Sequence, residues 1–476
     1  MAKDLRTFLK QYESDYPEDV VHIEKEINNN QEITAIVAKL EKQYKYPLLI
    51  FHNVINPEGN PSGHWVVTNV LASRTRYARI CNSTFETLGR DVYQRTRTQR
   101  QTPTVIPKNQ APIKEIIKKS GQIKLLEFPV LVHNEMDAGN YFSGAFLVTY
   151  DPDSGIDNCA LQRGWVFDKD TIRVLVAMLM HNGLNLYKHE QKNQDMKVAY
   201  WMGHHPLAYI GGLAKLPYPS SHYEAIGGML EEPLRLVPSE TLGDDFLVPA
   251  DAEIVVEGII EANKRYAEGP FGEYPRHVGA QLLSPQFKVT AITHRNNAIW
   301  YDIAAGWADH NGAGSPPIEG QLWETLKGRF PSLQNVYMPI SGTGRFHAYL
   351  QFKNPGPTDA KQAIIMATTL MSGIVKHAFA FDDDVDIFDE KEVLWAIATR
   401  SQWAKDVVIL PHTRGGALDP SSGLPGEDAA GGIDCTKPWG ESFEEKVRVE
   451  QSILDKIDIK DYISTKDINK IKIERS

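Results

Sequence analysis

A series of short apolar segments between Gln122 and Tyr301 constrains the fold more than any other feature of the sequence. These segments are rich in β-branched and aromatic residues and are separated by turn-forming residues, which predicts strands in a mixed or antiparallel β-layer. The predicted strands cover residues 128–132, 146–150, 198–202 and 254–260. Asn296 and Asn297 lie between two further apolar runs, which predicts a tight hairpin turn between residues 289–293 and 298–301.

A different pattern, in which strands and helices alternate, follows between residues 335 and 400. Strands are predicted at residues 335–338, 347–352 and 377–381, and helices at the starts marked by Asp359 and by the Asp389-x-x-Glu392 capping pattern. The acidic residues 382–384 indicate a solvated loop at a strand end rather than a divalent-metal site. Ser442-x-x-Glu445 is a second capping pattern, which predicts a charged C-terminal helix packed on a partner subunit.

The N-terminal part of the chain predicts a smaller α/β segment. Leu5, Phe8 and Leu9 lie on one face of an amphipathic helix, and its acid and base residues exclude a secretory signal core. Residues 46–54 read as a buried strand, and the arginine-rich stretch 74–100 as a solvated helical face rather than a phosphate or RNA site. We expect an α/β fold of mixed α+β type with parts at residues 1–115, 116–305, 320–440 and 441–476.

Composition narrows the class of protein. The 476 residues are too many for one ordinary core, and the net charge of −10 without a basic run disfavours nucleic acid and anionic membrane surfaces as partners. The three scattered cysteines contain no C-x-x-C, which fits a reducing compartment and gives no zinc signature. No apolar run approaches the length of a membrane span. We therefore expect a cytoplasmic enzyme.

Two acids, Glu268 and Glu273, flank the sequence Gly-Pro-Phe-Gly. A proline and two glycines in this interval predict a bent loop, which can direct both carboxylates into one cavity. Two carboxylates in one site interact, so that one can stay protonated near neutral pH and act as a proton donor. Taken alone, the segment favours an ordinary surface turn with solvated acids. The pair His204 and His205, at a predicted strand end, is interpreted as structural.

Several motifs in order carry a resemblance to a known family. They are Asp157-Asn-Cys-Ala-Leu-Gln-Arg163, His181 in Met-Leu-Met-His-Asn, Glu224 in Ser-His-Tyr-Glu-Ala, Glu268-Gly-Pro-Phe-Gly-Glu273, and the segments 249–258, 385–389 and 432–438. In order and spacing they resemble the UbiD family of decarboxylases, which use prenylated FMN. The resemblance covers nearly the whole chain. It implies a split β-barrel-like flavin-binding domain at 116–305, a C-terminal α/β oligomerisation domain with a terminal helix, and assembly into at least a homodimer.

The resemblance also implies a set of ligands. Asn158, His181 and Glu224 would hold a divalent metal, usually manganese, that bridges to the cofactor phosphate, and such oxygen and imidazole donors suit a hard cation. Potassium would lie near Glu224, with Arg400 and Asp434 as a supporting salt bridge. The prenylated FMN would be lined by Asn158, Cys159, Ala160, Leu161, Gln162, Arg163, Met180, His181, Glu224 and Lys376. A flavin prenyltransferase would supply the cofactor.

The implied reaction is loss of CO2 from an aromatic or heteroaromatic acid through a covalent adduct with prenylated FMN. Arg163 would orient the substrate carboxylate, Glu268 would pair with Arg163, and Glu273 would deliver the proton. The chain departs from many relatives in the residues after Glu273, so that Tyr274, Arg276, His277 and His310 are candidate substrate contacts. Arg276 and His277 suggest a dicarboxylate or furan-type acid, and Arg276 as a surface salt-bridge partner is an equal alternative.

Three alternatives stay open at this point. Within the family, the substrate could be a phenolic acid or a polyprenyl-hydroxybenzoate. A metal-dependent hydrolase could use the same residues, although no H-E-x-x-H motif supports it. A non-enzymatic assembly partner is a third reading, which the complete set of Arg163, Glu268 and Glu273 disfavours.

Overall fold

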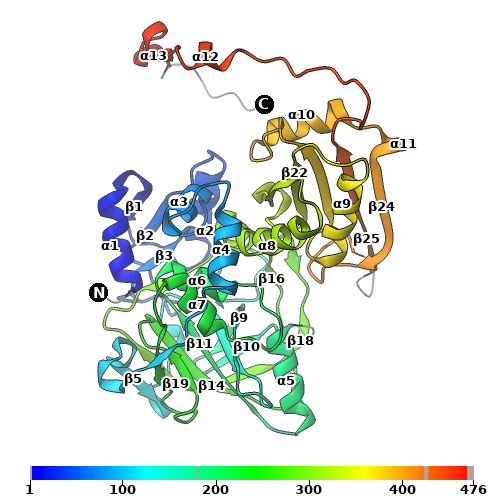
Figure 1. The fold of residues 1–476 in the computed structure, drawn as a ribbon. Helices are drawn as coiled ribbons and strands as arrows, with labels where there is room; N and C mark the ends of the chain where they lie inside the picture. The colour runs from blue at the N-terminus through cyan, green and yellow to red at the C-terminus, as the bar shows by residue number, and fades with distance from the viewer. Residues whose placement is uncertain (1–2, 177–179, 372, 423–426, 469–476) are drawn as a thin grey trace. The chain divides into compact units, whose positions relative to one another are not determined.

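The computed structural model describes residues 3–176, 180–371, 373–422 and 427–468. The chain forms two compact units, Met1–Thr436 and Lys437–Ser476. Helices and strands alternate through the first unit in a mixed α/β fold, as the sequence predicts (Figure 1). Among the described residues, no helix has both the length and the apolar character needed to cross a membrane.

A curled, largely antiparallel sheet forms the middle of the first unit. Its strand order is β6-β9-β10-β19-β14-β11-β7-β8, with β5 paired to β19. The strands are β5 Ile116–Lys119, β6 Tyr141–Phe142, β7 Phe146–Tyr150, β8 Asp157–Leu161, β9 Gly164–Asp168, β10 Thr171–Val174, β11 Met196–Met202, β14 Ile254–Ile260 and β19 Gln286–His294. Helices α5 His181–Gln191, α6 Pro206–Gly212 and α7 His222–Leu230 connect or cover them. The antiparallel β-layer predicted between residues 122 and 301 is therefore confirmed.

Both faces of this central sheet are buried, which explains why its strands read as continuous apolar runs. Along β11, Ala199 and Trp201 pack into one hydrophobic cluster and Val198 and Tyr200 into a second cluster on the opposite face. Successive side chains of a strand point to opposite faces, so each face receives its own core. Strand β14 lies between β11 and β19 and is paired on both sides.

The prediction of a strand at residues 128–132 is wrong. This segment follows the 3-10 turn Leu125–Glu127 and forms only isolated bridges at Leu131 and Val132. Pro129 lacks a backbone N–H and cannot join a strand ladder on both sides, which explains the interruption. Small two- and three-stranded sheets complete the domain, formed by β4 Thr104–Val105, β12 Arg235–Pro238, β13 Leu247–Pro249, β15 Tyr266–Glu268, β16 Phe271–Gly272, β17 Val278–Gly279 and β18 Leu282–Ser284.

The N-terminal segment builds a four-stranded sheet that borrows its last strand from the central part of the chain. Its order is β1 Val20–Ile23, β2 Leu48–Phe51, β3 Val66–Thr68 and β20 Trp300–Tyr301, with helices α1 Leu5–Asp15, α2 Glu32–Glu41, α3 Arg74–Ile80 and α4 Leu88–Arg97. The predicted hairpin at Asn296–Asn297 is therefore wrong. The chain does turn there, but β20 pairs with β3 rather than with β19, because the N-terminal segment supplies a competing partner strand.

The arginine-rich stretch 74–100 is only partly the solvated face that its sequence indicates. Arg76 is fully buried and pairs with Asp19 at 2.8 Å, and Arg74 pairs with Glu319 at 2.9 Å. Buried guanidinium groups need such partners, and both acids lie far away in the sequence. The basic residues therefore join α3 to other parts of the first unit rather than face solvent as a set.

The C-terminal part of the first unit is a five-stranded sheet of order β21-β22-β23-β25-β24. Its elements are α8 Ala308–Arg329, β21 Leu333–Tyr337, β22 His347–Phe352, α9 Asp359–Leu370, β23 His377–Asp382, α10 Glu390–Arg400, α11 Trp403–Asp406, β24 Val407–Arg414 and β25 Glu427–Cys435. The predicted strands and helices of residues 335–400 are confirmed to within two residues at most of their ends, and Asp389 caps α10 through the backbone N–H of Lys391. The prediction that the acidic residues 382–384 form a solvated loop is wrong in part, because Asp382 and Asp384 pair with Arg400.

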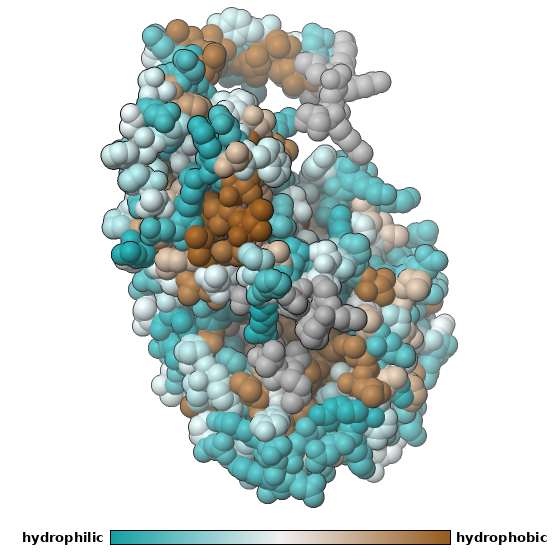
Figure 2. Space-filling model, turned by 90° about the vertical axis from the view of Figure 1, so that its right-hand side faces the viewer, coloured by the Kyte–Doolittle hydropathy of each residue, from teal (hydrophilic) through white to brown (hydrophobic). Residues whose placement is uncertain are grey.

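Exposed apolar side chains gather on one side of this C-terminal sheet, over α9 and β24. Ile365, Leu370 and Ile409 are exposed there, and Figure 2 shows a hydrophobic patch on this side of the molecule. An exposed edge strand and apolar patch of this kind are typical of a protein–protein contact.

Up to residue 468, where the described part of the second unit ends, its helices are short: α12 Gln451–Leu454, α13 Ile459–Tyr462 and α14 Thr465–Ile468. The predicted helix beginning at Ser442 is therefore wrong, because residues 443–450 have no regular structure. A capping pattern satisfies the first turn of a helix, but the following residues bury no apolar face that would stabilise further turns.

Candidate active site

Arg163 is the centre of a buried three-residue network. Its Nε and Nη2 donate to the two carboxylate oxygens of Glu268 at 3.0 and 2.6 Å, and its Nη1 donates to Oε1 of Glu273 at 2.6 Å. The three residues expose only 7%, 0% and 8% of their surface. One guanidinium therefore holds both acids that the sequence singles out, and it does so away from bulk water.

The predicted bend between the two acids is confirmed, and glycine is required to make it. Gly269 has φ +88°, and a Cβ there would lie 3.1 Å from the carbonyl oxygen of Ala280 and 3.2 Å from Nη2 of Arg163. The strands on either side, β15 and β16, pair with β18 and β17 respectively, so the acids come from two separate short ladders. The chain can bring Glu268 and Glu273 to one guanidinium only through this turn.

Residues from the loop before β6 fix the second acid in place. Asp137 accepts hydrogen bonds from the backbone N–H groups of Gly272 at 2.8 Å and of Asn134 at 2.8 Å. The Tyr141 hydroxyl donates to Oε1 of Glu268 at 3.3 Å, and Phe271 packs under the Arg163 guanidinium at 5.3 Å from its ring centroid. Arg163 and Glu268 thus each have a further side-chain contact, and the backbone next to Glu273 is held by Asp137.

Burial raises the pKa of Glu273 above its ordinary value, although Arg163 opposes this shift. The negative charge of Glu268 acts in the same direction as burial. A carboxyl group in such surroundings keeps its proton to higher pH than a solvated one and can deliver it in a reaction near neutrality. The arrangement therefore has the charge asymmetry that proton donation needs.

The predicted metal ligands lie on one side of the central sheet. Asn158 on β8 and His181 at the start of α5 approach each other, with Oδ1 and Nδ1 3.2 Å apart. Glu224 lies in the first turn of α7, and the Glu224 carboxylate pairs with Arg100 at 2.6 Å. Ser221, which precedes α7, donates to Asp157 at the start of β8. The structure brings Asn158 and His181 together and holds Glu224 on an adjoining helix.

These donors fit a divalent cation. An amide oxygen, a carboxylate oxygen and an imidazole nitrogen form a hard ligand set. Partial burial, and secondly the nearby Lys215, lower the pKa of His181 and so favour the neutral ring, which has a lone pair for a metal. Only Asn158 and His181 are seen in contact, because Glu224 pairs with Arg100.

The segment predicted to line the cofactor is the edge strand β8 and the residues after it. Cys159 points into a hydrophobic core and is buried, whereas Ala160 and Leu161 are half-buried. Gln162 donates to the carbonyl of Leu175, and Met180, just before α5, is 57% exposed. The edge strand β8 offers unpaired backbone groups. Helix α5 begins without a side-chain cap, so its first N–H groups are also available. Both kinds of group suit a polar cofactor.

Lys376 lies apart from this strand, on the C-terminal sheet. Its Nζ pairs with Asp419 at 2.6 Å and with Asp428 at 3.1 Å. Of the predicted potassium residues, Arg400 pairs with Asp384 at 2.8 Å, whereas Asp434 accepts from the N–H and hydroxyl of Thr436. The predicted salt bridge between Arg400 and Asp434 is therefore wrong, because the adjacent acidic run supplies closer partners.

The candidate substrate contacts separate into two groups. Tyr274 and His310 lie together, with ring centroids 6.2 Å apart, immediately after Glu273 in sequence and at the start of α8. Arg276 instead pairs with Glu41 at 2.9 Å, donates to the carbonyl of Gly306 and stacks on Trp307. His277 lines a separate cavity of about 300 Å³ that also contains Lys376 and Asp419. Arg276 thus has the salt-bridge partner that one of its two sequence interpretations requires.

Sequence patterns alone did not indicate several residues of the site. Arg345 lies with its Cζ 4.3 Å from the ring centroid of Tyr274, and Lys215 lies near His181. Asp137 and Tyr141 hold the two acids. None of these residues belongs to a recognisable motif, and each reaches the site only through the tertiary fold.

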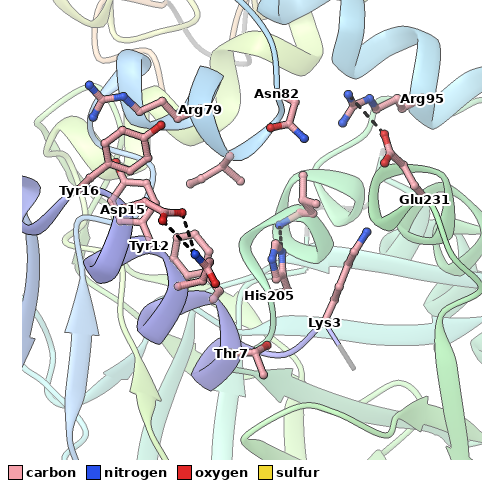
Figure 3. A pocket seen from close by; sticks show the side chains of 14 residues that line it. Lys3, Thr7, Tyr12, Asp15, Tyr16, Arg79, Asn82, Arg95, His205 and Glu231 are labelled. Atoms are coloured by element: carbon pink, nitrogen blue, oxygen red, sulfur yellow. Dashed lines mark hydrogen bonds and ion pairs between the residues drawn. The ribbon is translucent and has the colours of Figure 1, made fainter. Parts of the chain in front are cut away.

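A cavity of about 490 Å³ next to α1 contains none of the predicted residues. Figure 3 shows Arg95 beside Glu231, with which it pairs at 3.5 Å. The Asp15 carboxylate accepts from the amide of Gln11. His205 caps α6 by accepting from the N–H of Leu207, in agreement with its structural interpretation. Because the described residues of this cavity hold no pair of acids at one guanidinium, it is a weaker candidate for catalysis than the Arg163 network.

Comparison with known proteins identifies the family. Three family models match consecutive parts of the chain: the N-terminal domain of 3-octaprenyl-4-hydroxybenzoate carboxy-lyase at residues 14–96, its Rift-related domain at 104–307 and its C-terminal domain at 313–435. The chain belongs to the UbiD family of decarboxylases, which are carboxy-lyases.

Curated relatives and solved structures agree with this assignment. The chain is 30% identical to a phenolic acid decarboxylase of Sedimentibacter hydroxybenzoicus over 92% of each chain, and 30% identical to an anhydromevalonate phosphate decarboxylase of Methanothermobacter thermautotrophicus over 70% of this chain and 78% of the relative. The UbiD-class enzyme HmfF from Pelotomaculum thermopropionicum, solved with FMN, is 32% identical with a TM-score of 0.88, covering 97% of this chain and 100% of that one. An evolved dimeric form of HmfF was solved with prenylated FMN.

Proposed function

We propose that this protein decarboxylates an aromatic or heteroaromatic carboxylic acid, with prenylated FMN as cofactor and Glu273 as the proton donor. The observation that carries the proposal is the single guanidinium of Arg163 that holds both Glu268 and Glu273 in a buried network. A furan-type acid or a dicarboxylate is the preferred substrate. Phenolic acids and polyprenyl-hydroxybenzoates are alternatives within the same family, and the reaction is reversible in principle.

Each residue of the network has a distinct role. Arg163 is the only cation in contact with both acids among the described residues, so it orients a substrate carboxylate beside Glu273. Glu268 takes two of the three hydrogen bonds of Arg163 and fixes the guanidinium plane. Glu273, whose pKa burial raises, then gives its proton to the carbon that loses CO2 and is reprotonated from solvent.

When bound, prenylated FMN would supply the electron sink that a carbon losing CO2 requires and that no ordinary side chain offers. The residues that would hold it are β8 and the residues around it, from Asn158 to Arg163, together with Met180. Asn158, His181 and Glu224 would hold a Mn²⁺ or other divalent ion near the cofactor phosphate, and Lys215 adds an exposed positive charge beside His181. Potassium near Glu224, and contact of Lys376 with the phosphate, are further parts of the proposal.

The proposed assembly is a homodimer or higher homo-oligomer through the C-terminal sheet. The exposed Ile365, Leu370 and Ile409 on that sheet support it, because an apolar patch on an edge strand favours burial against a second copy. The protein is proposed to act in the cytoplasm, with a flavin prenyltransferase as the supplier of its cofactor.

The test is a visible spectrum and an intact-cofactor mass of the protein co-produced with a flavin prenyltransferase and supplied with manganese and potassium. A prenylated-FMN mass with a flavin-like band, followed by CO2 release from aromatic or furan-type acids, is expected. Screening anhydromevalonate phosphate and phenolic acids in parallel separates the substrate classes of the relatives. Folded, metal-bearing protein that carries no flavin under these conditions would contradict the decarboxylase mechanism and favour a hydrolase.

A further inference from the structure

Arg345 lies near Glu273 and has no salt-bridge partner among the described residues. It lies between the 3-10 turn Ile340–Gly342 and β22, and its Nη1 is buried without a hydrogen-bond partner. Among the residues that the structure describes, no carboxylate comes within salt-bridging distance of its guanidinium. Burial lowers the pKa of Arg345 from its ordinary value, and Glu273 and Tyr274 oppose this shift from nearby. A guanidinium stays charged in proteins, so this site holds a positive charge that has no ion-pair partner in contact among the described residues.

The chain makes room for this guanidinium. A Cβ on Gly314 would lie 2.7 Å from Nη2 and 3.1 Å from Cζ of Arg345, so any larger residue in this turn of α8 would displace the arginine. The opposite side of the guanidinium stacks on Tyr274, with Cζ 4.3 Å from the ring centroid. Arg345 is thus held between α8 and the residue that follows Glu273.

Two further polar side chains near Arg345, those of His310 and Tyr274, are donors as well. His310 accepts from the backbone N–H of Gly306 through Nδ1 at 3.2 Å, which places the proton of the neutral ring on Nε2. Burial lowers the pKa of His310 to about 3, so the ring stays neutral. Burial raises the pKa of Tyr274 to about 12, so its hydroxyl keeps its proton. Neither Nε2 of His310 nor the Tyr274 hydroxyl has an acceptor among the described residues.

We propose that Arg345, with His310 and Tyr274, binds a second carboxylate of the substrate, so that the enzyme prefers an aromatic or heteroaromatic dicarboxylic acid. The Glu273 carboxylate acts on Arg345 from nearby but is already held by Arg163 at 2.6 Å, so the Arg345 guanidinium keeps hydrogen-bonding capacity for an anion that the substrate supplies. One guanidinium and two neutral donors match the single charge and two oxygens of a carboxylate better than the double charge of a phosphate. The inference rests on the proposed function, because it places the second carboxylate beside Glu273 while the first meets Arg163.

This assignment moves the dicarboxylate preference to residues that the sequence did not indicate for it. Arg276 was the arginine expected to bind a second acidic group, but its Nη2 already pairs with Glu41 at 2.9 Å. Arg345 has no such partner, and it lies against Tyr274, whereas Arg276 stacks on Trp307. The unpaired guanidinium, not the paired one, has free hydrogen-bonding capacity for a ligand.

The experiment compares two substrates that differ only in the second carboxylate, furan-2,5-dicarboxylate and furan-2-carboxylate, on the holoenzyme. Arg345→Gln is expected to lower kcat/KM for the diacid about 10- to 100-fold, mainly through KM, and to change that for the monoacid little. Arg345→Lys should restore part of the diacid preference, because a point charge remains. Arg265→Gln, which removes an arginine paired with Glu190 at the far end of α5, is the matched control.

Four results would overturn the proposal. Equal losses for both acids in Arg345→Gln would show a structural role, and loss of bound flavin in that variant would assign Arg345 to the cofactor phosphate. If Arg276→Gln, and not Arg345→Gln, selectively lowered kcat/KM for the diacid, the second carboxylate would be assigned to Arg276 instead. A phosphorylated acid whose turnover alone depends on Arg345 would replace the carboxylate by a phosphate.

Calorimetric binding of the diacid to the Glu273→Gln holoprotein, with and without Arg345→Gln, separates this inference from the proposed function. One outcome is that the diacid binds only when Arg345 is present, while the parent protein decarboxylates none of the acids. This outcome would support the anion site and contradict decarboxylation. Turnover of the monoacid together with diacid binding that is unchanged by Arg345→Gln would support decarboxylation and contradict the anion site.

Discussion

Nη1 of Arg163 lies 2.6 Å from Oε1 of Glu273, so the residue proposed to orient the substrate carboxylate also touches the residue proposed to protonate the product. This contact joins the orientation of the substrate and the transfer of the proton in one hydrogen bond. Because the pair is almost fully buried, replacing either member changes the charge of an interior site.

Glu273→Gln is expected to abolish turnover while the protein keeps its fold and its flavin. Glutamine has nearly the shape of glutamic acid and still accepts from Arg163, but it has no acidic proton to give, and loss of a general acid costs about 10²- to 10⁴-fold in rate. The measurement is single-turnover CO2 release together with the flavin spectrum.

Glu190→Gln, at the far end of α5, is the control for this experiment. Glu190 also pairs with an arginine, Arg265 at 2.6 Å, but lies away from the Arg163 network. Decarboxylation by Glu273→Gln at a rate near that of Glu190→Gln would remove Glu273 from the mechanism.

Glu268→Gln is expected to slow the reaction and to move the pH profile. Arg163 lowers the pKa of Glu273, and Glu268 raises it. Without the charge of Glu268, the pKa of Glu273 falls, so the loss of activity that accompanies its deprotonation occurs at lower pH. The pH dependence of kcat/KM measures this shift, and a rate loss with an unmoved profile would mean that Glu268 acts on position only.

His181→Ala is expected to reduce bound manganese and, with it, bound flavin. The imidazole is one of two donors that the structure brings within 3.2 Å of each other, so its loss removes half of that pair. Metal content by mass spectrometry gives the result without any activity assay. His189→Ala is the matched control, because this histidine is on the same helix and bonds only the carbonyl of Asn185. Equal metal content in the two variants would contradict the assignment.

Asp309→Asn is expected to make thermal stability less dependent on pH. Burial raises the pKa of Asp309 to about 7, from an ordinary value near 3.8. The folded protein therefore retains a proton that the unfolded chain loses, and stability falls as pH rises from about 4 to 7, by up to about 4 kcal/mol. Asparagine keeps the bond from the N–H of Leu71 and removes this titration.

Melting temperatures at pH 5 and pH 8 test the last prediction. The drop between the two should be smaller in Asp309→Asn than in the parent protein. The same drop in both would show that another group causes the pH dependence.

Local patterns predicted the secondary structure well where each element carries its own signal. The alternation of residues 335–400 gave β22, α9 and α10 nearly at their observed ends, because the strands are apolar and their helices begin at capping residues. The paired acids around Gly269 also carry their own turn signal. Asn158 and His181 were joined through the family resemblance rather than through spacing, and the structure places them in contact.

Long-range partners could not be read from local patterns. Strand β20 leaves its sequence neighbour β19 for β3, which lies more than 200 residues earlier in the chain, and Arg400 selects Asp384 over Asp434. Arg345 lies in a segment of ordinary turn residues, and only the fold shows that no carboxylate of the described residues forms a salt bridge with it. Partner choice between distant segments depends on tertiary packing, which no window of the sequence contains.

The two functional halves of the site come from different parts of the chain. Arg163, Glu268 and Glu273 lie within the Rift-related domain, whereas Arg345 belongs to the C-terminal domain and His310 lies at the junction between the two. The proposed anion site therefore spans both domains, because Tyr274 lies in the Rift-related domain beside the proposed proton donor. Exchange of the C-terminal domain between relatives would replace Arg345 while leaving Tyr274 and the Arg163 network in place.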